Sequence, residues 1–461
     1  MRRLIGLLTL LSLGLLGTPA SAQGLFGGLL TTLGQVLSGQ NQNQGQGVIV
    51  RTTLGLHGLQ NVCLSNGCTV VGNLDGNANQ LFLVRPAQGL VPQLLAGVLQ
   101  LVAGILDAEP DQTLVIPPNN NNQATASTAP QGLWDTIPVN YYGNTVTDGY
   151  VNQPAAQIIH VAQAHNVFKV SGSGIVADID TGVDPNHPAL QGVLLPGYDF
   201  TRNQPDASEL TDVSLSSPPP CLTCAAAYVN QHTAAMLDQH TAAMLDGSQY
   251  AAFGHGTMVM GVIHLVAPTA KLLPVKAFSA NGSGSLSNIL AGIYYAVQSK
   301  ANVINMSFDL TANSAELSTA INYANSHKVI CVASSGNDGK QEMVYPAGMQ
   351  YVMGVASTNN QDQRSTFSNY GNQIVWVAAP GEAIITTYPF GTYAAGWGTS
   401  FSSPMVAGTA SLVVNMQPAF NENQASWTIA HAKYVGLNMG NGRLDVYGAL
   451  SSLNPILGLL Q

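Results

Sequence analysis

Between about residues 133 and 453, short apolar runs alternate along the chain with stretches of helical periodicity. Short, continuous apolar runs are typical of strands that are buried on both faces of a parallel sheet. Between them, residues 285–299 and 315–326 carry apolar side chains at the spacing of a helix. This alternation predicts one α/β domain with a doubly wound, mostly parallel sheet. The strands that we predict cover residues 174–180, 271–278, 301–307, 328–333, 351–357 and 374–379.

Residues 48–117 have a different pattern, which predicts a small α/β module. Three short strands are expected at 48–53, 68–71 and 80–85, followed by an apolar helix over 89–106. Pro92 and the glutamines of that helix argue against a membrane span, so we expect it to pack on the module. Residues 118–132 are rich in Asn, Ala and Thr and predict a linker before the domain at 133–453, and residues 454–461 form a C-terminal tail.

The first 22 residues are organised as a secretory signal peptide. Two arginines precede an apolar run from Leu4 to Leu16, and Ala20-Ser21-Ala22 is a typical cleavage site. The run is too short to cross a bilayer, so a removed signal is expected and not a membrane anchor. Residues 23–47 are Gly/Leu-rich and then Gln/Asn-rich, which predicts a flexible leader. The mature protein is expected to be secreted, either outside the cell or into a periplasm.

Composition agrees with secretion and excludes some partners. Only 8% of the 461 residues are charged and the net charge is −9, so neither nucleic acid nor, after signal removal, a membrane is an expected partner. Five cysteines cannot all pair within the chain. Cys63 and Cys68 flank a turn-like sequence and are placed to bridge, whereas Cys331 lies in an apolar strand and is expected to be buried and unpaired.

A long segment around residues 214–249 carries two unusual features. Cys221 and Cys224 form a C-x-x-C that either closes a small loop or, with His232 and His240, binds zinc; the histidine spacing is unlike common zinc fingers. Residues 231–238 are repeated without change at 239–246. Two copies are too few for a repeat fold, so we interpret them as a duplication in a surface insertion.

Three short segments carry an acid, a base and a nucleophile in a fixed order. They are Asp180-Thr-Gly, His255-Gly-Thr and Gly398-Thr-Ser400-Phe-Ser-Ser-Pro. Each is surrounded by small residues that let backbones approach closely, and together they supply the groups for covalent acyl transfer. Taken singly, Asp180 and Ser400 have structural explanations as caps of a turn or a helix. Their joint occurrence in one order favours a hydrolase.

The order Asp, His, Ser and the flanking sequences resemble the subtilisin-like serine peptidases, peptidase family S8. The resemblance implies that Ser400 is the nucleophile, that His255 is the general base, and that Asp180 orients the imidazole. A fourth segment, 333–339, resembles the family's oxyanion loop and implies that Asn337 donates its amide to the oxyanion, with the Ser400 backbone N–H as second donor.

The same resemblance implies a set of substrate-binding residues: Ser307, Phe308, Asp309, Ser335 and Gly336. Asp309 and Leu310 stand where the family normally has two glycines, so the first specificity pocket differs. Asp309 either favours basic side chains in the substrate or points to solvent.

Asp178 is a second departure from the family pattern. It lies two residues before Asp180, so both carboxylates face the same side of a strand. If both are buried, their repulsion raises one pKa; the alternative is a hydrogen-bonded or protonated structural Asp. His187 and His264 are expected to be structural.

The family resemblance also bears on partners and cofactors. Proteins or peptides are the expected substrates, and the module at 48–117 occupies the position of the family's propeptide, a folding helper and transient inhibitor; the alternative is an unrelated accessory domain. No cofactor or catalytic metal is expected. The strong calcium site of several relatives is expected to be missing, because the chain after His255 continues directly into the next strand and Ala189 replaces an acid; other calcium sites stay open. We expect a monomer.

The sequence leaves two other functions open. A subtilisin-like fold without activity would serve in binding or adhesion, although the complete set of Asp180, His255, Ser400 and Asn337 weighs against it. Peptide ligation would use the same acyl-enzyme with an amine in place of water, and no residue favours it.

Overall fold

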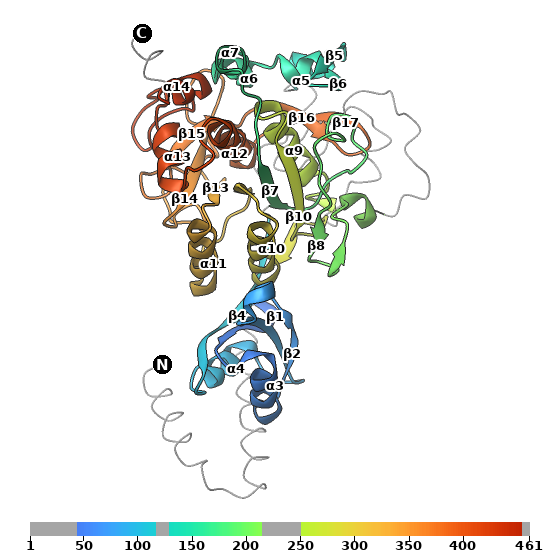
Figure 1. Ribbon diagram of the computed structural model, residues 1–461, viewed down its shortest axis with the longest axis vertical. Helices are drawn as coiled ribbons and strands as arrows, with labels where there is room; N and C mark the ends of the chain where they lie inside the picture. The colour runs from blue at the N-terminus through green and yellow to red at the C-terminus, as the bar shows by residue number, and fades with distance from the viewer. Residues whose placement is uncertain (1–43, 117–128, 214–249, 454–461) are drawn as a thin grey trace, which may run out of the picture. The chain divides into compact units, whose positions relative to one another are not determined.

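The computed structural model describes residues 44–116, 129–213 and 250–453. Within it the chain forms two compact units, Met1–Thr113 and Leu114–Gln461, each with a sheet and a core of its own (Figure 1). The predicted signal peptide, nearly all of the leader, most of the linker, the C-x-x-C, the tandem repeat and the C-terminal tail lie outside the described residues, so they stay predictions.

The first unit is an antiparallel sheet with two helices against it. Its elements are β1 (Gln44–Thr52), α3 (Gly55–Asn66), β2 (Cys68–Asn73), β3 (Leu81–Pro86), α4 (Pro92–Leu99) and β4 (Ile105–Val115), with a 3-10 turn at Gly76–Ala78. Within this unit the strand order is β4-β1-β3-β2, and every neighbouring pair is antiparallel. The order βαββαβ with this pairing is a ferredoxin-like arrangement.

A small apolar core holds this first unit together. Val48 and Val50 of β1 and Phe82 and Val84 of β3 are fully buried. These alternate positions face the two helices, whose buried residues on that side are Leu59 and Cys63 of α3 and Leu95, Ala96 and Leu99 of α4. The unit therefore has the interior of an independent small domain.

The helix that we predicted over 89–106 is wrong in its extent. α4 begins at Pro92 and ends at Leu99, and a turn that passes through Gly104 leads into β4 at Ile105. Gly104 has a φ of +90°, a conformation that favours glycine and ends any continuous helix. We missed β4 and α3, because the apolar residues of β4 become strand residues only through pairing with β1.

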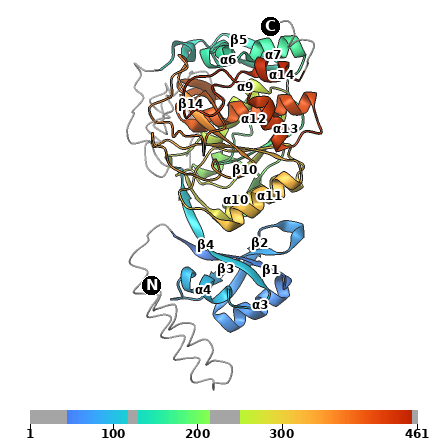
Figure 2. The same ribbon diagram turned by 90° about the vertical axis from the view of Figure 1, so that its left-hand side faces the viewer.

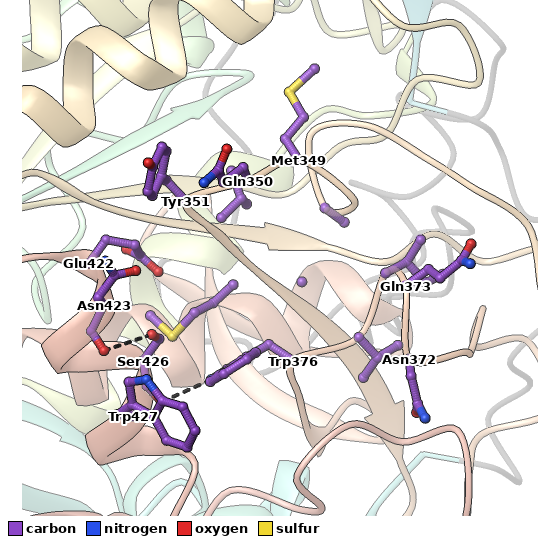
Figure 3. A pocket seen from close by; sticks show the side chains of 16 residues that line it. Met349, Gln350, Tyr351, Asn372, Gln373, Trp376, Glu422, Asn423, Ser426 and Trp427 are labelled. Carbon is purple, nitrogen blue, oxygen red and sulfur yellow. Dashed lines mark hydrogen bonds between the residues drawn. The ribbon is translucent and has the colours of Figure 1, made fainter.

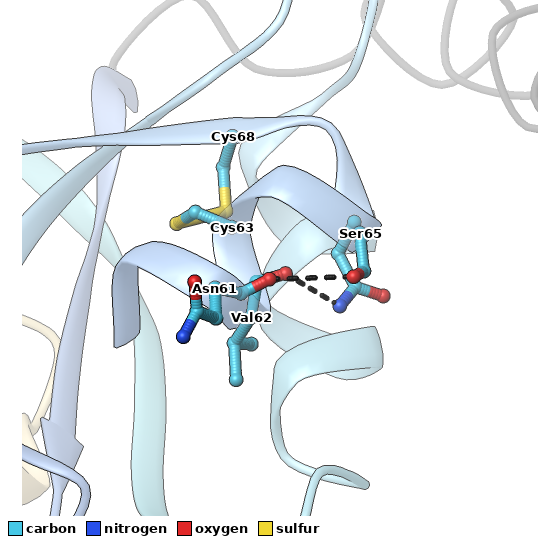
Figure 4. Close-up of a disulfide and its surroundings, with 6 residues drawn as sticks. Asn61, Val62, Cys63, Ser65 and Cys68 are labelled. Atoms are coloured by element: carbon cyan, nitrogen blue, oxygen red, sulfur yellow. Dashed lines mark hydrogen bonds between the residues drawn. A yellow bond between two sulfur atoms is a disulfide. The ribbon is translucent and has the colours of Figure 1, made fainter. Parts of the chain in front are cut away.

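Cys63 and Cys68 form the predicted disulfide (Figure 4). Cys63 lies in the last turn of α3 and Cys68 begins β2, with Gly67 between them in the left-handed conformation that closes the helix. The bridge joins the end of a helix to the start of the following strand. Cys331 is buried and free among the described cysteines, as predicted.

The second unit contains the predicted parallel sheet. All six predicted strands are present, as β7 (Ile175–Asp180), β10 (Lys271–Lys276), β12 (Val303–Met306), β13 (Ile330–Ser334), β14 (Val352–Thr358) and β15 (Val377–Pro380). With β8 (Tyr198–Asp199) and β9 (Gln204–Pro205) the order is β15-β14-β13-β12-β7-β10-β8-β9. All pairs are parallel except β8 with β9. The α/β fold class is confirmed.

Two pairs of helices enclose this sheet. α9 (His255–Val266) and α12 (Thr399–Met416) lie against each other and contact strands from β7 to β15 (Figure 1). α10 (Leu286–Gln298) and α11 (Ala315–Ser326) form the second neighbouring pair, side by side in both views (Figure 2). Nearly every residue of α9 and α12 is buried, so these two helices form the interior of the domain.

Shorter elements complete the second unit. They are β5 (Pro138–Tyr141), β6 (Asn144–Thr147), α5 (Asp148–Val151), α6 (Pro154–Ile158), α7 (Val161–Phe168), β11 (Ser283–Ser285), β16 (Ile384–Tyr388), β17 (Thr392–Gly396), α13 (Glu422–Ile429) and α14 (Val446–Ser451), with 3-10 turns at Gln131–Trp134 and Glu209–Asp212. Among the described residues no helix is long and apolar enough to cross a membrane.

The sheet topology places several candidate residues together at the carboxyl ends of its strands. β7 has β10 on one side and β12 on the other, so the winding of the sheet reverses at β7. Ligands of open α/β sheets bind outside the carboxyl ends of the strands at such a point. Asp180 is the last residue of β7, and Ser307 and Ser335 immediately follow β12 and β13.

Candidate active site

Asp180 and His255 form a closely bonded, buried pair. His255 Nδ1 lies 2.7 Å and 2.8 Å from the two carboxylate oxygens of Asp180, and both residues are at most 2% exposed. The backbone N–H of Thr181 donates to Asp180 Oδ1 at 2.6 Å and holds the carboxylate in place. Burial alone lowers the pKa of His255, but the charge and hydrogen bond of Asp180 outweigh it and raise that pKa overall.

Glycines allow the strand and the helix that carry this pair to approach each other. Gly254, with a φ of +89°, precedes His255 at the start of α9 and is packed against the ring of Tyr388. A Cβ at Gly256 would overlap the carbonyl oxygen of Gly182, so these two backbones are in direct contact. Side chains at these positions would push the acid and the base apart.

Ser400 is the second residue of α12, directly after the turn at Gly398. Its hydroxyl donates to the carbonyl oxygen of Ser307 at 3.2 Å, and the Ser307 hydroxyl donates to the Ser400 carbonyl at 3.1 Å. The second bond has a local reason, because Pro404 has no N–H with which to close the helical bond to that carbonyl. Ser307 therefore fixes the first turn of α12.

The serine and the histidine are near each other but are not hydrogen-bonded in this structure. His255 Nε2 is buried and has no partner among the described residues, and Phe401, next to Ser400, lies with its ring centroid 6.0 Å from that of His255. Catalytic hydrogen bonds are often loose without substrate and tighten in the complex.

Asn337 is held beside the Ser400 turn by Thr399. Its Oδ1 accepts the Thr399 backbone N–H and the Thr399 hydroxyl, both at 2.9 Å. The carbonyl end of the amide is thus occupied, and the –NH₂ end remains to donate. Asn337 itself is only half-buried.

The loop around Asn337 is shaped by Asn369, which the sequence analysis missed. Asn369 Oδ1 accepts the backbone N–H groups of Asp338 and Lys340, both at 3.0 Å, and its own N–H donates to the Gly336 carbonyl at 3.0 Å. Gly336 has a φ of +92° and its Cα faces the Asn369 amide. Only tertiary contact joins these segments, so no local pattern marks Asn369.

Asp178 heads a buried chain of hydrogen bonds that runs behind the nucleophile. Asn305 Nδ2 donates to Asp178 Oδ1 and to the Ser307 hydroxyl, both at 2.9 Å, and Asn305 Oδ1 accepts from Ser403 at 2.7 Å. Burial raises the pKa of Asp178 well above its ordinary value, and the charge of Asp180 raises it further. The charge of Asp180 thus acts on the pKa of Asp178, as the sequence led us to expect. Asp178 is also hydrogen-bonded to Asn305, as expected for a structural acid, so the two interpretations do not exclude each other.

The residues predicted to bind substrate line up on two neighbouring strand ends. Ser307 and Phe308 follow β12, Ser335 and Gly336 follow β13, and Ser334 Oγ donates to the Phe308 carbonyl at 3.4 Å. A Cβ built on Gly336 would lie 3.3 Å from Asp309 Oδ2, so the Asp309 carboxylate lies against this loop and not in open solvent. Burial, with nearby acids, raises the pKa of Asp309 to about 6.

The two other candidate histidines are enclosed by protein groups. His187 Nε2 lies 2.8 Å from the Thr392 carbonyl, and its Nδ1 accepts the Ala189 N–H. His264 lies 3.0 Å from the Tyr150 hydroxyl, and burial lowers its pKa to about 3. Both have the partners of structural residues. Among the described residues no cluster of three or more His, Cys, Asp or Glu could hold a metal ion; the proposed zinc ligands lie outside them.

A pocket of about 260 Å³ lies away from these residues, at the start of β14 (Figure 3). Trp376 and Trp427 line it, with Glu422 at the beginning of α13, and none of the predicted site residues does. Glu422 is 2% exposed and accepts the Cys331 N–H at 3.0 Å, and burial raises the pKa of its carboxyl to about 8.

The model of the subtilase family matches residues 171–449, which include Asp180, His255, Asn337 and Ser400. The chain belongs to the subtilase family. The thermophilic serine proteinase of Bacillus sp. (strain AK1) is 32% identical over 342 residues, which cover 74% of this chain and 75% of that protein. Thermitase of Thermoactinomyces vulgaris is 33% identical over 310 residues, 66% of this chain and 99% of thermitase.

The solved structures agree on the fold. The crystal structure of a lanthipeptide protease matches with a TM-score of 0.50 and 22% identity, over 66% of this chain and 95% of that one. As a subtilase the protein is a serine endopeptidase, and its substrates are proteins or peptides.

Proposed function

We propose that the subtilase chain cleaves peptide bonds through an acyl-enzyme on Ser400. The observation that carries the proposal is the buried Asp180–His255 pair with a free Nε2 beside the N-terminal turn of α12. Ser400 Oγ attacks the substrate carbonyl while His255 Nε2 takes its proton. The same proton then passes to the leaving amine, the C–N bond breaks, and water hydrolyses the ester by the reverse sequence.

The negative charge of the tetrahedral intermediate needs donors, and we assign Asn337 and the Ser400 backbone N–H to that role. The support is the Thr399 clamp on Asn337 Oδ1, which fixes the amide before substrate arrives. Preorganised donors of this kind stabilise a transition state without reorganisation at the moment of reaction. The Ser400 N–H also lies at the positive end of the α12 dipole.

A fluorophosphonate probe tests the assignment, because it forms a covalent bond only with an activated serine. The mature protein is expected to be labelled at Ser400, and Ser400→Ala is expected to show neither label nor peptide cleavage. A folded wild-type protein that takes no label would instead support a catalytically silent binding or adhesion protein. Product analysis with an added amine separates hydrolysis from ligation.

We also propose that the first unit is a propeptide that is removed after secretion and that inhibits the enzyme transiently until then. Its own core and its place between a predicted signal peptide and the catalytic unit support this role. Leu133 belongs to the core of the catalytic unit, so the cut is expected within residues 117–132. Mass spectrometry of the secreted protein checks this; a mature chain that retains residues 48–116 would support an accessory domain.

The remaining assignments concern cofactors and assembly. We propose a secreted monomer that needs no metal cofactor for activity. α9 connects to β10 through Ala267–Ala270 without the insertion that would carry the strong calcium site. Activity that survives dialysis against a chelator, together with a monomeric mass by light scattering, is the expected result; loss of activity that calcium restores would contradict it.

A further inference from the structure

Glu209 is a buried acid that the reaction above does not use. It opens the 3-10 turn Glu209–Asp212, and its exposed fraction is zero. The sequence gives no sign of it, because it lies in a polar stretch with no motif.

Four donors surround its carboxyl group. Oε2 accepts the Thr181 hydroxyl at 3.0 Å and the Gly254 backbone N–H at 2.8 Å. Oε1 accepts the Thr257 N–H at 3.3 Å and, at closer range, the Thr257 hydroxyl. Oε1 is thus hydrogen-bonded to α9. Oε2 is hydrogen-bonded to the N-cap of α9 and to Thr181 in the turn after β7. A carboxyl that is so fully satisfied has a fixed position.

These donors flank the catalytic acid and base in the sequence. Thr181 follows Asp180, and Gly254 precedes His255. Gly254 is the N-cap of α9 and has no side chain to accept the N–H groups of the first turn. Glu209 accepts two of them, and Thr181 Oγ1 accepts a third, from Gly256, at 2.9 Å.

We propose that Glu209 is a positioning residue, whose carboxyl group ties the end of β7 to the beginning of α9 and so holds Asp180 and His255 at bonding distance. The proposal rests on the proposed function of these two residues. Glu209 replaces the missing side-chain cap of α9 from another segment of the chain, and it does not touch substrate.

The charges around Glu209 link it to the pH range of activity. Burial is the largest influence on its pKa, which rises to about 7, while the hydrogen bonds and the charge of Lys276 oppose the rise. Asp178 on β7, His255 on α9 and Tyr388 on β16 respond to the charge of Glu209. Lys276 on β10 donates to the Thr181 carbonyl and to Asp212. An ionised Glu209 raises the pKa of His255, so its charge shifts the acid limb of activity upward.

Glu209→Gln tests the proposal, with Glu422→Gln as the matched control. Both replace a buried glutamate of raised pKa at the start of a short helical element, but Glu422 lies in the pocket away from the candidate site. The amide at 209 keeps the shape of the carboxyl group but points its –NH₂ at a backbone N–H. We expect kcat per titrated active site to fall about tenfold or more, with KM little changed, because small misplacements of catalytic groups are costly.

Fluorophosphonate titration counts active sites, so it separates positioning from stability. The acid limb of kcat/KM is expected at lower pH in Glu209→Gln and unchanged in Glu422→Gln. A Glu209→Gln enzyme with wild-type kcat per active site and an unmoved acid limb would overturn the positioning role, whatever its thermal stability.

A second variant covers the case in which Glu209→Gln does not fold. Thr181→Val leaves Glu209 in place but removes the hydroxyl that donates to Glu209 and accepts the Gly256 N–H. Because the other three donors to Glu209 remain, a smaller fall in kcat is expected; an unchanged kcat overturns the proposal. Failure of the proposed function is distinguishable, because the wild-type enzyme would then show no label on Ser400.

Discussion

Glu209 and Glu422 are both buried, but different parts of the chain donate hydrogen bonds to their carboxyl groups. Both are at most 2% exposed, and burial raises the pKa of each, to about 7 and about 8. Glu209 receives donors from both sides of the candidate catalytic pair, whereas one backbone donor, from Cys331, is recorded for Glu422 beside an open pocket. A raised pKa is therefore common to two glutamates whose hydrogen-bond partners differ. The positioning role proposed for Glu209 depends on the elements that its carboxyl group joins, and not on its pKa.

The largest effect is expected from Asn337→Leu, which tests the proposed oxyanion donor. The variant keeps the size of the side chain and removes its N–H donor. We expect the variant to fold, because Asn369 still holds the loop. Its kcat is expected to fall about 100- to 1000-fold, the usual cost of one oxyanion donor. Single-turnover kinetics with an ester and an amide substrate measure this; a fall below tenfold would assign the oxyanion to other donors.

Asp309→Asn tests whether the carboxylate of Asp309 makes the enzyme prefer substrates with a basic side chain. A partly exposed carboxylate stabilises a basic substrate side chain by up to about 1 kcal/mol, so the preference for Lys or Arg over Leu is expected to fall up to about fivefold. Because the pKa of Asp309 is about 6, the wild-type preference should grow as the pH rises through 6. Matched peptide pairs at pH 5 and 8 give the ratio. A constant preference for large apolar residues in both enzymes would remove Asp309 from specificity.

Glu422→Gln probes the other glutamate through stability. Its folded pKa of about 8 lies above the ordinary 4.5, so the stability that the protonated carboxyl permits is complete below pH 4.5 and is lost as the pH rises through 8. The amide cannot ionise and still accepts the Cys331 N–H. In a Ser400→Ala background the Tm is expected to rise by a few degrees at pH 9 and to stay unchanged at pH 4. Equal Tm values at pH 9 would mean that Glu422 ionises without penalty.

Asp178→Asn has the smallest expected effect. Burial and Asp180 favour the protonated form of Asp178, and an amide keeps an acceptor for Asn305. The kcat and its pH profile should therefore match those of the wild type. A displaced acid limb would show that Asp178 carries charge during turnover, and it would then belong with Glu209 in the electrostatics of His255.

Much of the architecture could be predicted from local sequence, since strands buried on both faces are continuous apolar runs. The six strands from 174–180 to 374–379 illustrate this, and Asp180 and the Asn337 loop fall at the carboxyl ends of two of them, as a doubly wound sheet leads one to expect. The helix predicted over 89–106 was wrong in extent because the structure of its last residues depends on a distant strand and not on local sequence. The residues after Gly104 are apolar enough for either structure, and their pairing with β1 decides for a strand.

The parts of the site that sequence could not supply are the supporting contacts. Glu209 and Asn369 bond to partners 28 or more positions away, and Asn305 bonds to Asp178 at 127 positions; nothing beside these residues in the chain signals such partners. The small residues around Asp180 and His255 were visible, but what they contact was not. Motifs thus locate the candidate catalytic residues, and only the fold shows the contacts that hold them.

The contact between Gly182 and Gly256 limits how this protein can be engineered. Neither residue belongs to the proposed catalytic or substrate-binding residues, yet any side chain at Gly256 would overlap the Gly182 backbone. A mutant library that spares only the reacting residues would therefore contain many inactive clones from these two positions. Diversity is better placed at Asp309, a proposed substrate-binding residue that is only partly buried, so that the two backbone segments stay in contact.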